Sequence, residues 1–264
     1  MIELDNIHVT FNPGTPLENH VLRGINLRID NGEFATVIGG NGAGKSTLLN
    51  VLAGEVCAQP GRVLIGERDV TRLPAFKRAD LVARVYQDPL AGTCGSLTLE
   101  ENMALACARG RRRGLGSALD SALRGRLQDN LARLGLGLEN RLNDSIGLLS
   151  GGQRQAVSLL MAALQPMEIL LLDEHTAALD PRIASFVLTL SADIIREQRL
   201  TALMVTHSMR QALDVGDRTI MMDQGEIAFD VRGEQRQGLD VADLLKLFER
   251  ARGQEVDDDS LLLG

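Results

Sequence analysis

Cysteine is scarce and unpaired in this chain. The 264 residues include three cysteines, Cys57, Cys94 and Cys107. Their number is odd and their spacing lacks the paired pattern of a metal-binding motif, so we expect reduced packing residues rather than a disulfide or a zinc site. Cysteine chemistry therefore does not organise this protein.

Long apolar runs and repeats are also lacking. No stretch of 18 consecutive apolar residues, the length that suggests a membrane-spanning helix, occurs in the sequence. The first five residues do not have the charged-then-apolar pattern of a signal peptide. No fixed-period repeat is seen, and the one biased segment is a short acidic stretch at 257–259. We therefore expect a cytoplasmic protein.

An excess of basic residues is lacking as well. The formal net charge is −7, whereas nucleic-acid binders usually have a basic overall balance or face. Direct binding of nucleic acid is not the expected function. The hydrophobic fraction of 44% and the charged fraction of 24% are ordinary for a globular protein. A chain of this length fits one large domain or two closely joined lobes.

The most informative segment is rich in glycine and follows the apolar run Phe34 to Ile38. Residues 39–47 fit the spacing G-x-x-x-x-G-K-[ST], and apolar residues at helical spacing follow them. In such a strand, loop and helix, backbone N–H groups surround a polyphosphate and the helix N-terminus adds positive potential. A chance glycine-rich turn is the alternative. The candidate nucleotide-binding residues are Gly39, Asn41, Gly42, Ala43, Gly44, Lys45, Ser46 and Thr47.

Three side chains of this loop have distinct expected roles. Lys45 reaches the β- and γ-phosphates, and Thr47 contacts the α-phosphate. Ser46 carries a hydroxyl that can enter a Mg²⁺ shell made otherwise of water and phosphate oxygens. The sequence therefore predicts nucleotide binding with magnesium.

The N-terminal part has the pattern of an antiparallel β lobe. Residues 2–11 and 25–30 alternate or cluster apolar side chains as strands do, and the loop residues 12–16 separate them. Phe11 stands just before that loop. It is a candidate to stack on a purine ring, but a core role is equally open.

A helical pattern occupies residues 97–165. A further apolar strand at 81–86 precedes it and ends at Gln87, which is placed to touch a ligand at the edge of a sheet. Thr98 begins the helical region with a capping pattern. The basic run 109–113 has two interpretations, a solvated loop or a contact with acidic lipid or a partner.

A second helix N-terminus suited to anions lies within this helical region. In Leu149-Ser150-Gly151-Gly152-Gln153 the serine is a natural N-cap, and the glycines leave backbone donors uncovered. It belongs to a different part of the chain from the loop around Lys45, so one bound phosphate does not explain both.

Acidic residues follow an apolar strand pattern at 169–172. Adjacent strand residues point in opposite directions, so Asp173 can orient the Mg²⁺ shell while Glu174 faces an attacking water. The next apolar run, 202–205, leads to His207, which can donate to a γ-phosphate oxygen. The carboxyl ends of parallel strands are where open α/β sheets bind ligands.

Taken together, these motifs resemble the ATP-binding subunits of ABC transporters over nearly the whole chain, in the family's order. The signature Leu-Ser-Gly-Gly-Gln at 149–153 discriminates best, because many other P-loop proteins lack it. The resemblance implies a head-to-tail homodimer with two sandwiched ATP molecules, in which Ser150, Gly151, Gly152 and Gln153 complete the opposite subunit's site.

The same resemblance implies roles for individual residues. Glu174, His207 and Gln87 are the expected catalytic residues, and Ser46, Gln87 and Asp173 the expected Mg²⁺ residues. Gln87 also links to the membrane subunit. Asp180 lies at the dimer seam.

The chain departs modestly from the family pattern. Phe11 replaces the commoner tyrosine of the adenine-stacking position, and Gly40 adds flexibility. His175 stands where proline usually follows the catalytic glutamate, and we expect a structural or subgroup role for it. The stretch 173–181 is similar to a bacterial subgroup of tryptophan/tyrosine-type importers.

The predicted fold is an α/β P-loop NTPase (RecA-like) core with an N-terminal antiparallel β lobe and an inserted α-helical subdomain. The resemblance implies that residues 1–264 form one ABC ATPase domain. Its expected parts are the catalytic core with the β lobe (1–88 and 166–230), the helical subdomain with the signature motif (89–165), and a short C-terminal helix with an acidic tail (231–264).

The expected function is ATP hydrolysis that energises solute transport, most simply uptake of an amino acid or related solute. The expected partners are integral-membrane permease subunits and, indirectly, a solute-binding protein, which places the chain on the inner face of the cell membrane. We expect residues 88–93 to contact the permease, with Arg111 to Arg113 as the next surface. Two alternatives remain: a soluble ABC ATPase acting on ribosomes or nucleic acid, and a nucleotide-gated binding module with little turnover.

Overall fold

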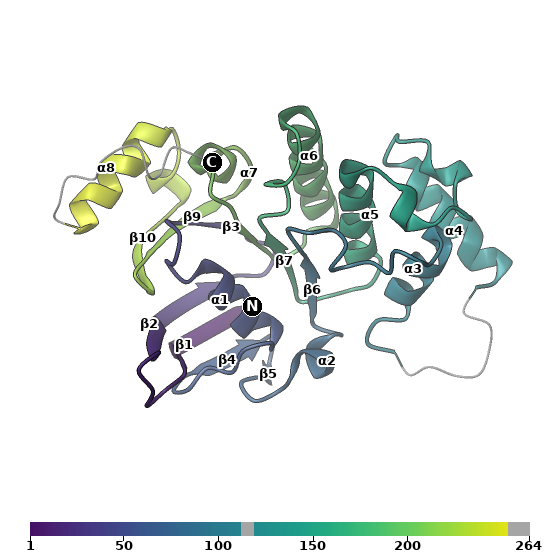
Figure 1. The fold of residues 1–264 in the computed structure, drawn as a ribbon. Coiled ribbons are helices and arrows are strands. Elements are labelled where there is room, and N and C mark those ends of the chain that lie inside the picture. Colours follow the sequence, from purple (N-terminus) through teal and green to yellow (C-terminus); the bar gives the residue numbers. More distant parts are fainter. Residues whose placement is uncertain (112–118, 253–264) are drawn as a thin grey trace.

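The computed structural model describes residues 1–111 and 119–252. Two β-sheets and several helices form its layers, with helices on both faces of the larger sheet (Figure 1). Arg112 and Arg113 of the basic run and the acidic stretch 257–259 lie outside the described residues. None of the helices in the described part is long and apolar enough to span a membrane.

The larger sheet has six strands in the order β10-β9-β3-β8-β7-β6. Its parallel strands pair β6 with β7, β7 with β8, and β3 with both β8 and β9, while β10 is antiparallel to β9. The central strands are mostly apolar because both faces of the sheet are covered. The strands are β3 (Phe34–Ile38), β6 (Val82–Val85), β7 (Ile169–Asp173), β8 (Ala202–Val205), β9 (Arg218–Asp223) and β10 (Glu226–Arg232).

The smaller sheet has four strands in the order β2-β1-β4-β5, all antiparallel, as expected for the N-terminal lobe. The strands are β1 (Ile2–Phe11), β2 (Asn19–Ile29), β4 (Arg62–Ile65) and β5 (Arg68–Asp69). The sequence predicted the second strand over 25–30, but β2 begins at Asn19. Its first residues are exposed on both faces and pair with the end of β1, so they lack the apolar signal.

The larger sheet separates two apolar cores. On one face, α1 (Lys45–Ala53) and the smaller sheet pack against alternate strand residues such as Val37, Leu171 and Val205. On the other face, α5 (Gly151–Ala163) and α6 (Pro181–Gln198) pack against the residues between them, such as Leu170 and Met204. This alternation follows from the two-residue period of a strand.

A helical lobe extends from the β6 edge of the sheet (Figure 1). Its helices surround a third core, which includes Leu127 and Ile146. The predicted capped start is confirmed, because Thr98 and Glu101 form a capping box. The lobe contains α3 (Leu99–Cys107), α4 (Ser121–Ala132), η1 (Leu138–Asn140), η2 (Ile146–Leu148) and α5.

Two of the remaining helices pack against strands of the larger sheet, α7 (Met209–Val215) against β3 and α8 (Val241–Arg252) against β10. A small core that includes Met209, Leu244 and Phe248 joins the C-terminal helix to the sheet. The others in the described part are α2 (Ala75–Arg78) and η3 (Gly233–Gln235). The predicted strand 226–230 continues to Arg232.

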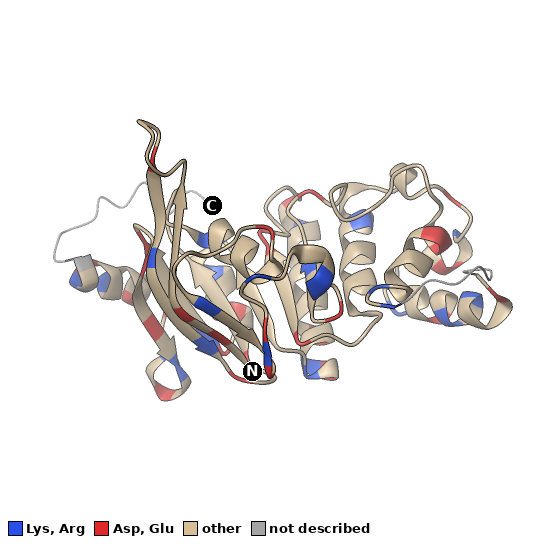
Figure 2. Ribbon diagram, turned by 90° about the horizontal axis from the view of Figure 1, so that it is seen from below, with Lys and Arg blue, Asp and Glu red and all other residues tan. Residues whose placement is uncertain are grey.

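Charged residues of both signs are interspersed along the strands of the smaller sheet (Figure 2). Arg62 and Asp69 form a salt bridge at 2.8 Å between β4 and β5, and Arg28 pairs with Asp30 at 3.1 Å. Such exposed pairs contribute little to stability.

Candidate functional site

The glycine-rich loop connects β3 to α1, as the sequence predicted. Gly44 has a φ of 100° and Gly39 a φ of 151°. A Cβ atom at Gly39 would lie 2.3 Å from the Met222 carbonyl oxygen, so this position tolerates no side chain. No side chain caps the N-terminus of α1, which follows the carboxyl end of β3, and the first N–H groups of a helix have no partner within it.

Lys45 folds back over this loop. Its Nζ donates to the Gly39 carbonyl oxygen at 2.7 Å and to that of Gly40 at 3.1 Å. Burial lowers the pKa of Lys45, and the negative charges of Glu174 and Asp173 oppose that shift. The ammonium group thus lies near two carboxylates at the place where the phosphates are expected.

Ser46, Asn41 and Gly42 are exposed on the same loop, while Ala43 is buried and Thr47 partly buried. Ser46 follows Lys45 in the first turn of α1, and its side chain is exposed. The structure therefore offers a hydroxyl and free backbone donors beside one cation, which suits a polyphosphate.

Two carboxylates lie at the carboxyl end of β7. Asp173 is its last residue, and the Asp173 Oδ2 accepts from Arg84 Nη2 at 2.6 Å. Glu174 has a φ of 44°, and its backbone N–H donates to the Val205 carbonyl oxygen at 3.0 Å. A positive φ at a residue other than glycine is costly, and such strain concentrates at functional sites.

Glu174 also contacts the predicted histidine. The Nε2 of His207 lies 2.7 Å from the Glu174 Oε1, with the glutamate carboxylate mostly buried and the imidazole partly exposed. Strand β8 delivers His207 two residues after its end at Val205. The sequence placed both residues at the same sheet edge but did not predict this contact.

A hydrogen-bonded loop holds His207 in place. Thr206 Oγ1 donates to the side-chain oxygen of Gln211 at 2.9 Å, and Thr176 Oγ1 donates to the same oxygen at 3.3 Å. The Ser208 hydroxyl caps α7. Gln211 thus joins the loops after β7 and β8, a role that the sequence did not signal.

Gln87 is exposed beyond the end of β6. The residue before it, Tyr86, accepts at its carbonyl oxygen from the Gln155 amide Nε2 at 3.0 Å. Gln155 belongs to α5, the helix that the signature motif begins. The structure thus ties the segment that carries Gln87 to that helix, which the sequence did not predict.

The signature motif begins α5 as expected. Ser150 is the N-cap: its hydroxyl accepts from the Gln153 backbone N–H at 3.3 Å, and Gln153 Oε1 accepts from the Ser150 N–H at 3.2 Å. This is a capping box. Ser150 and Gly151 are exposed, so the helix N-terminus is open to solvent.

Gly152 and Asp180 lie close to the same surface. A Cβ atom at Gly152 would lie 2.2 Å from Ile183 Cγ2, so α5 and the start of α6 approach closely there. Asp180 caps α6 by accepting from the Ile183 N–H at 3.2 Å. The role of Asp180 at a dimer seam stays a prediction.

Phe11 ends β1, where it pairs with Asn19, and 40% of its surface is exposed. It is therefore not a core residue of the chain. Its ring is available for a partner, and stacking on adenine stays a prediction.

His175, the departure from the family pattern, is buried in the core. Its Nε2 lies 2.8 Å from the Ser191 hydroxyl, and that hydroxyl donates to the Val187 carbonyl oxygen. The Ser191 oxygen must therefore accept from Nε2–H, and the buried ring is neutral in this tautomer because desolvation disfavours its charged form. Burial lowers its pKa to about 4.

This burial predicts a pH-dependent stability. In the unfolded chain His175 gains a proton near its ordinary pKa of 6.5, whereas the folded chain resists protonation until about pH 4. Stability is therefore full above pH 6.5 and falls by up to roughly 3 kcal/mol as the pH drops to 4. In His175→Gln the amide can still donate a hydrogen bond but does not gain a proton. We expect its free energy of unfolding, measured with urea, to fall less than that of wild type between pH 6.5 and pH 4. Equal pH slopes would contradict the prediction.

The fold and site define a P-loop NTPase, with a phosphate loop, an acidic strand end and a histidine on one sheet edge. Residues 22–177 match the family described as ABC transporter. The tyrosine transport ATP-binding protein of Clostridioides difficile (strain R20291) is 41% identical over 253 residues, 95% of this chain and 100% of the relative. The thiamine import ATP-binding protein ThiQ of Salmonella choleraesuis (strain SC-B67) is 36% identical over 221 residues, 84% of this chain and 89% of the relative.

Solved structures of other proteins have a similar fold. The dimeric ATP-binding cassette MJ0796 in a post-hydrolysis state, bound to ADP and Pi, superposes with a TM-score of 0.75 at 29% identity, covering 88% of this chain and 98% of that one. CbiO1 from Clostridium perfringens shares the fold, with a TM-score of 0.75 at 23% identity, covering 94% of each chain. The chain belongs to the ABC transporter family, as an ATP-binding subunit and ATPase.

Proposed function

We propose that this ATPase powers the uptake of a small solute, an amino acid or a related compound, through a separate permease. The single observation that carries the hydrolytic part is the meeting of Glu174, His207 and Asp173 with the Lys45 loop at one sheet edge. The uptake part draws support from relatives named for tyrosine transport and thiamine import.

In this proposal the loop holds the nucleotide. Lys45 leaves the Gly39 and Gly40 carbonyl oxygens for the β- and γ-phosphates, and the α1 N–H groups donate to phosphate oxygens. Phe11 stacks on adenine. Glu174 orients and deprotonates the attacking water, and His207, held 2.7 Å from that carboxylate, donates to the γ-phosphate.

The oxygen donors at this edge fit magnesium. The described residues contain no cluster of three or more His, Cys, Asp or Glu side chains that could hold a metal. Mg²⁺ does not need one, since it usually binds through one or two carboxylates together with phosphate oxygens and water. Ser46, Asp173 and Gln87 would hold it, and its charge would stabilise the phosphates in the transition state.

The open N-terminus of α5 supports a composite site. The helical lobe presents an anion-binding helix end at Ser150, Gly151, Gly152 and Gln153, while Lys45 begins α1 beside the larger sheet. Two copies arranged head to tail would place each α5 N-terminus on the partner's γ-phosphate. We therefore propose a homodimer with two ATP molecules at its interface and Asp180 at the seam.

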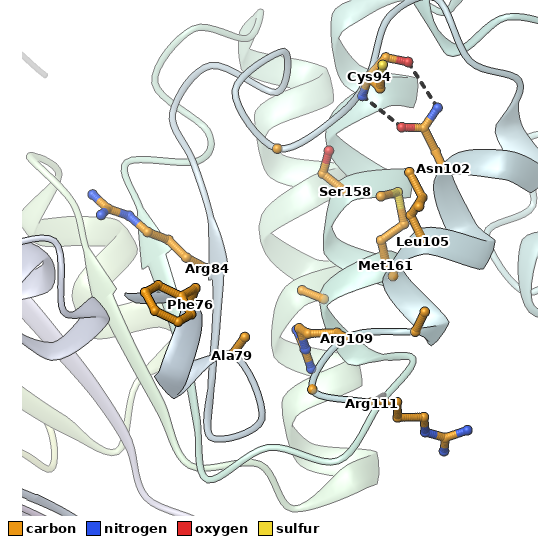
Figure 3. A pocket seen from close by; sticks show the side chains of 15 residues that line it. Phe76, Ala79, Arg84, Cys94, Asn102, Leu105, Arg109, Arg111, Ser158 and Met161 are labelled. Atoms are coloured by element: carbon orange, nitrogen blue, oxygen red, sulfur yellow. Dashed lines mark hydrogen bonds between the residues drawn. The ribbon is translucent and has the colours of Figure 1, made fainter. Parts of the chain in front are cut away.

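A groove of about 640 Å³ between the β6 edge of the sheet and the helical lobe is the proposed permease contact (Figure 3). Phe76 and Ala79 of the core face Leu105 and Met161 of the helical lobe, with Arg109 and Arg111 at one end. An apolar groove with cationic neighbours suits a short amphipathic permease helix with acidic residues. In this proposal the chain lies on the inner face of the membrane, and a solute-binding protein is an indirect partner.

This groove modifies one expectation from the sequence. Of the segment 88–93, only Gly92 lines the groove, whereas the half-exposed Leu90 does not. Arg111 does line it. The contact surface in this proposal therefore lies mainly on α2, α3 and α5.

The groove predicts a variant that loses coupling. We expect Phe76→Asp to keep the basal ATPase rate of the isolated protein and to lose most of the stimulation by its permease, because a charge weakens an apolar contact. Leu17→Asp is the matched control, since Phe76 and Leu17 are both 76% exposed and Leu17 lies on the β1–β2 loop. Stimulated ATPase in proteoliposomes measures the effect. Equal stimulation of both variants would place the contact elsewhere.

Copurification tests the whole proposal. Expressed with its cognate permease and solute-binding protein, the chain should form a complex whose ATPase rate rises when the solute is added. Failure to bind any permease, together with cosedimentation with ribosomes, would favour the alternative of a soluble ABC ATPase.

A further inference from the structure

A charged residue interrupts the buried strand β6. The side chain of Arg84 is 9% exposed, and its neighbours Val82, Ala83 and Val85 are buried. Burying a charge is costly unless the group is paired. Arg84 therefore needs partners in the protein, and their identity shows what the residue does.

The guanidinium of Arg84 joins three elements. Nη2 donates to the Asp173 Oδ2 at 2.6 Å, and Nη1 donates to Asn50 Oδ1 at 2.8 Å and to Glu55 Oε2 at 2.9 Å. Its Cζ lies 4.7 Å from the centre of the Tyr86 ring. In Figure 3 the guanidinium points away from the residues of the helical lobe. Arg84 thus connects the end of β7 to α1 and the residues that follow it.

The hydrogen bonds of Arg84 do not maximise the stability of the folded chain. The Nε of Arg84 is buried and makes no hydrogen bond. A buried donor without a partner lowers stability, and an apolar residue on β6 would avoid that loss. Its Nη2, however, fixes the position of the Asp173 carboxylate, while Nη1 anchors the guanidinium to Asn50 and Glu55.

A second buried arginine shows what a purely structural role looks like. Arg218, whose side chain is 6% exposed, pairs with Glu33 and Asp230. It begins β9, at the opposite end of the sheet from the phosphate loop. Burial and pairing are thus common to both arginines, and contact with Asp173 distinguishes Arg84.

We infer that Arg84 is a positioning residue for Asp173. It holds Oδ2 and leaves Oδ1 to face the metal shell beside Ser46. Partners of this kind orient the groups that bind a metal, and their loss costs about 10–100-fold in metal affinity or activity. This inference rests on the proposed function, because it assumes that Asp173 orients Mg²⁺.

The test measures binding rather than turnover. Calorimetry gives the affinity for AMP-PNP, a non-hydrolysable ATP analogue, first with excess EDTA and then with excess MgCl₂. We expect Mg²⁺ to tighten binding in wild type. We call the increase in AMP-PNP affinity from EDTA to MgCl₂ the gain from Mg²⁺. In Arg84→Met the affinity in EDTA should stay unchanged, while this gain falls about tenfold. Arg84→Lys, which keeps the charge but not the forked geometry, should recover part of the gain.

Two controls separate positioning from general damage. Arg218→Met removes an equally buried arginine and should lower thermal stability without changing the gain from Mg²⁺. In Asp173→Asn the gain is already reduced, and adding Arg84→Met should reduce it no further, because Arg84 acts through Asp173. If Arg84→Met does not fold, Arg84→Lys carries the test in the same two backgrounds.

The outcomes are distinct. A normal gain in Arg84→Met, or an additional loss in the double variant, would overturn the role of Arg84. No gain in wild type, or a full gain in Asp173→Asn, would instead overturn the proposed metal role of Asp173. The expected pattern, a loss in Arg84→Met that vanishes in Asp173→Asn, supports both.

Discussion

Replacing Glu174 with glutamine is expected to slow ATP hydrolysis at least about 100-fold, the contribution typical of a general base. The amide keeps the shape of the side chain but cannot accept a proton from water. Because Lys45 and the α1 N-terminus are untouched, ATP binding should persist. Single-turnover hydrolysis and equilibrium ATP binding measure the two effects separately.

Trapped ATP should also favour the dimer. Size-exclusion chromatography of Glu174→Gln with MgATP is expected to show a dimer that wild type forms only transiently. His175→Gln serves as a neighbouring control, since His175 faces the core and Ser191 rather than the phosphate loop. Hydrolysis by Glu174→Gln at the wild-type rate would remove Glu174 from the central role.

Local sequence patterns were enough to predict the main elements of the fold. Apolar runs gave strands such as β7 and β8, and the glycine spacing gave the loop before α1. The acidic residues and His207 could be assigned to one sheet edge because parallel strands end on the same side. A serine or threonine before periodic apolar residues predicted the helix N-caps at Ser150 and Thr98.

Contacts between distant segments could not be predicted in this way. The pairs Arg84 with Asp173 and Gln155 with Tyr86 join residues 89 and 69 positions apart. Their geometry depends on how β6, β7 and α5 pack, which no local period encodes. One signal was present, since an arginine within the apolar run 81–85 must find a partner. The burial of His175 likewise depends on α6, which the sequence near residue 175 does not specify.

A composite dimer makes a prediction that a one-chain site cannot share. Ser150→Arg places a bulky cation at the α5 N-terminus, and Lys45→Ala removes the phosphate-binding ammonium from the loop. Each variant alone should lose nearly all ATPase activity, because both sites of its homodimer carry the lesion. Ser150→Arg should still bind ATP through its intact Lys45.

The effect of Ser150→Arg must be separated from the loss of a helix cap, which costs about 1 kcal/mol. Asp120 offers a matched control in the same lobe, where its Oδ1 caps α4 by accepting from the Leu123 N–H at 2.7 Å. Asp120→Arg removes that cap away from the signature motif. It should lower stability comparably and leave the ATPase rate near wild type.

Mixing Ser150→Arg with Lys45→Ala then decides between the arrangements. In a mixed dimer one site combines the intact Lys45 loop of one chain with the intact Ser150 helix of the other, and the second site carries both lesions. Random exchange makes about half of the dimers mixed, so about a quarter of the wild-type activity should return if sites act independently. Sites built within one chain would all remain defective. Absence of recovery, with mixed dimers demonstrated by differently tagged chains, would mean either that each site lies within one chain or that both sites must be intact for hydrolysis.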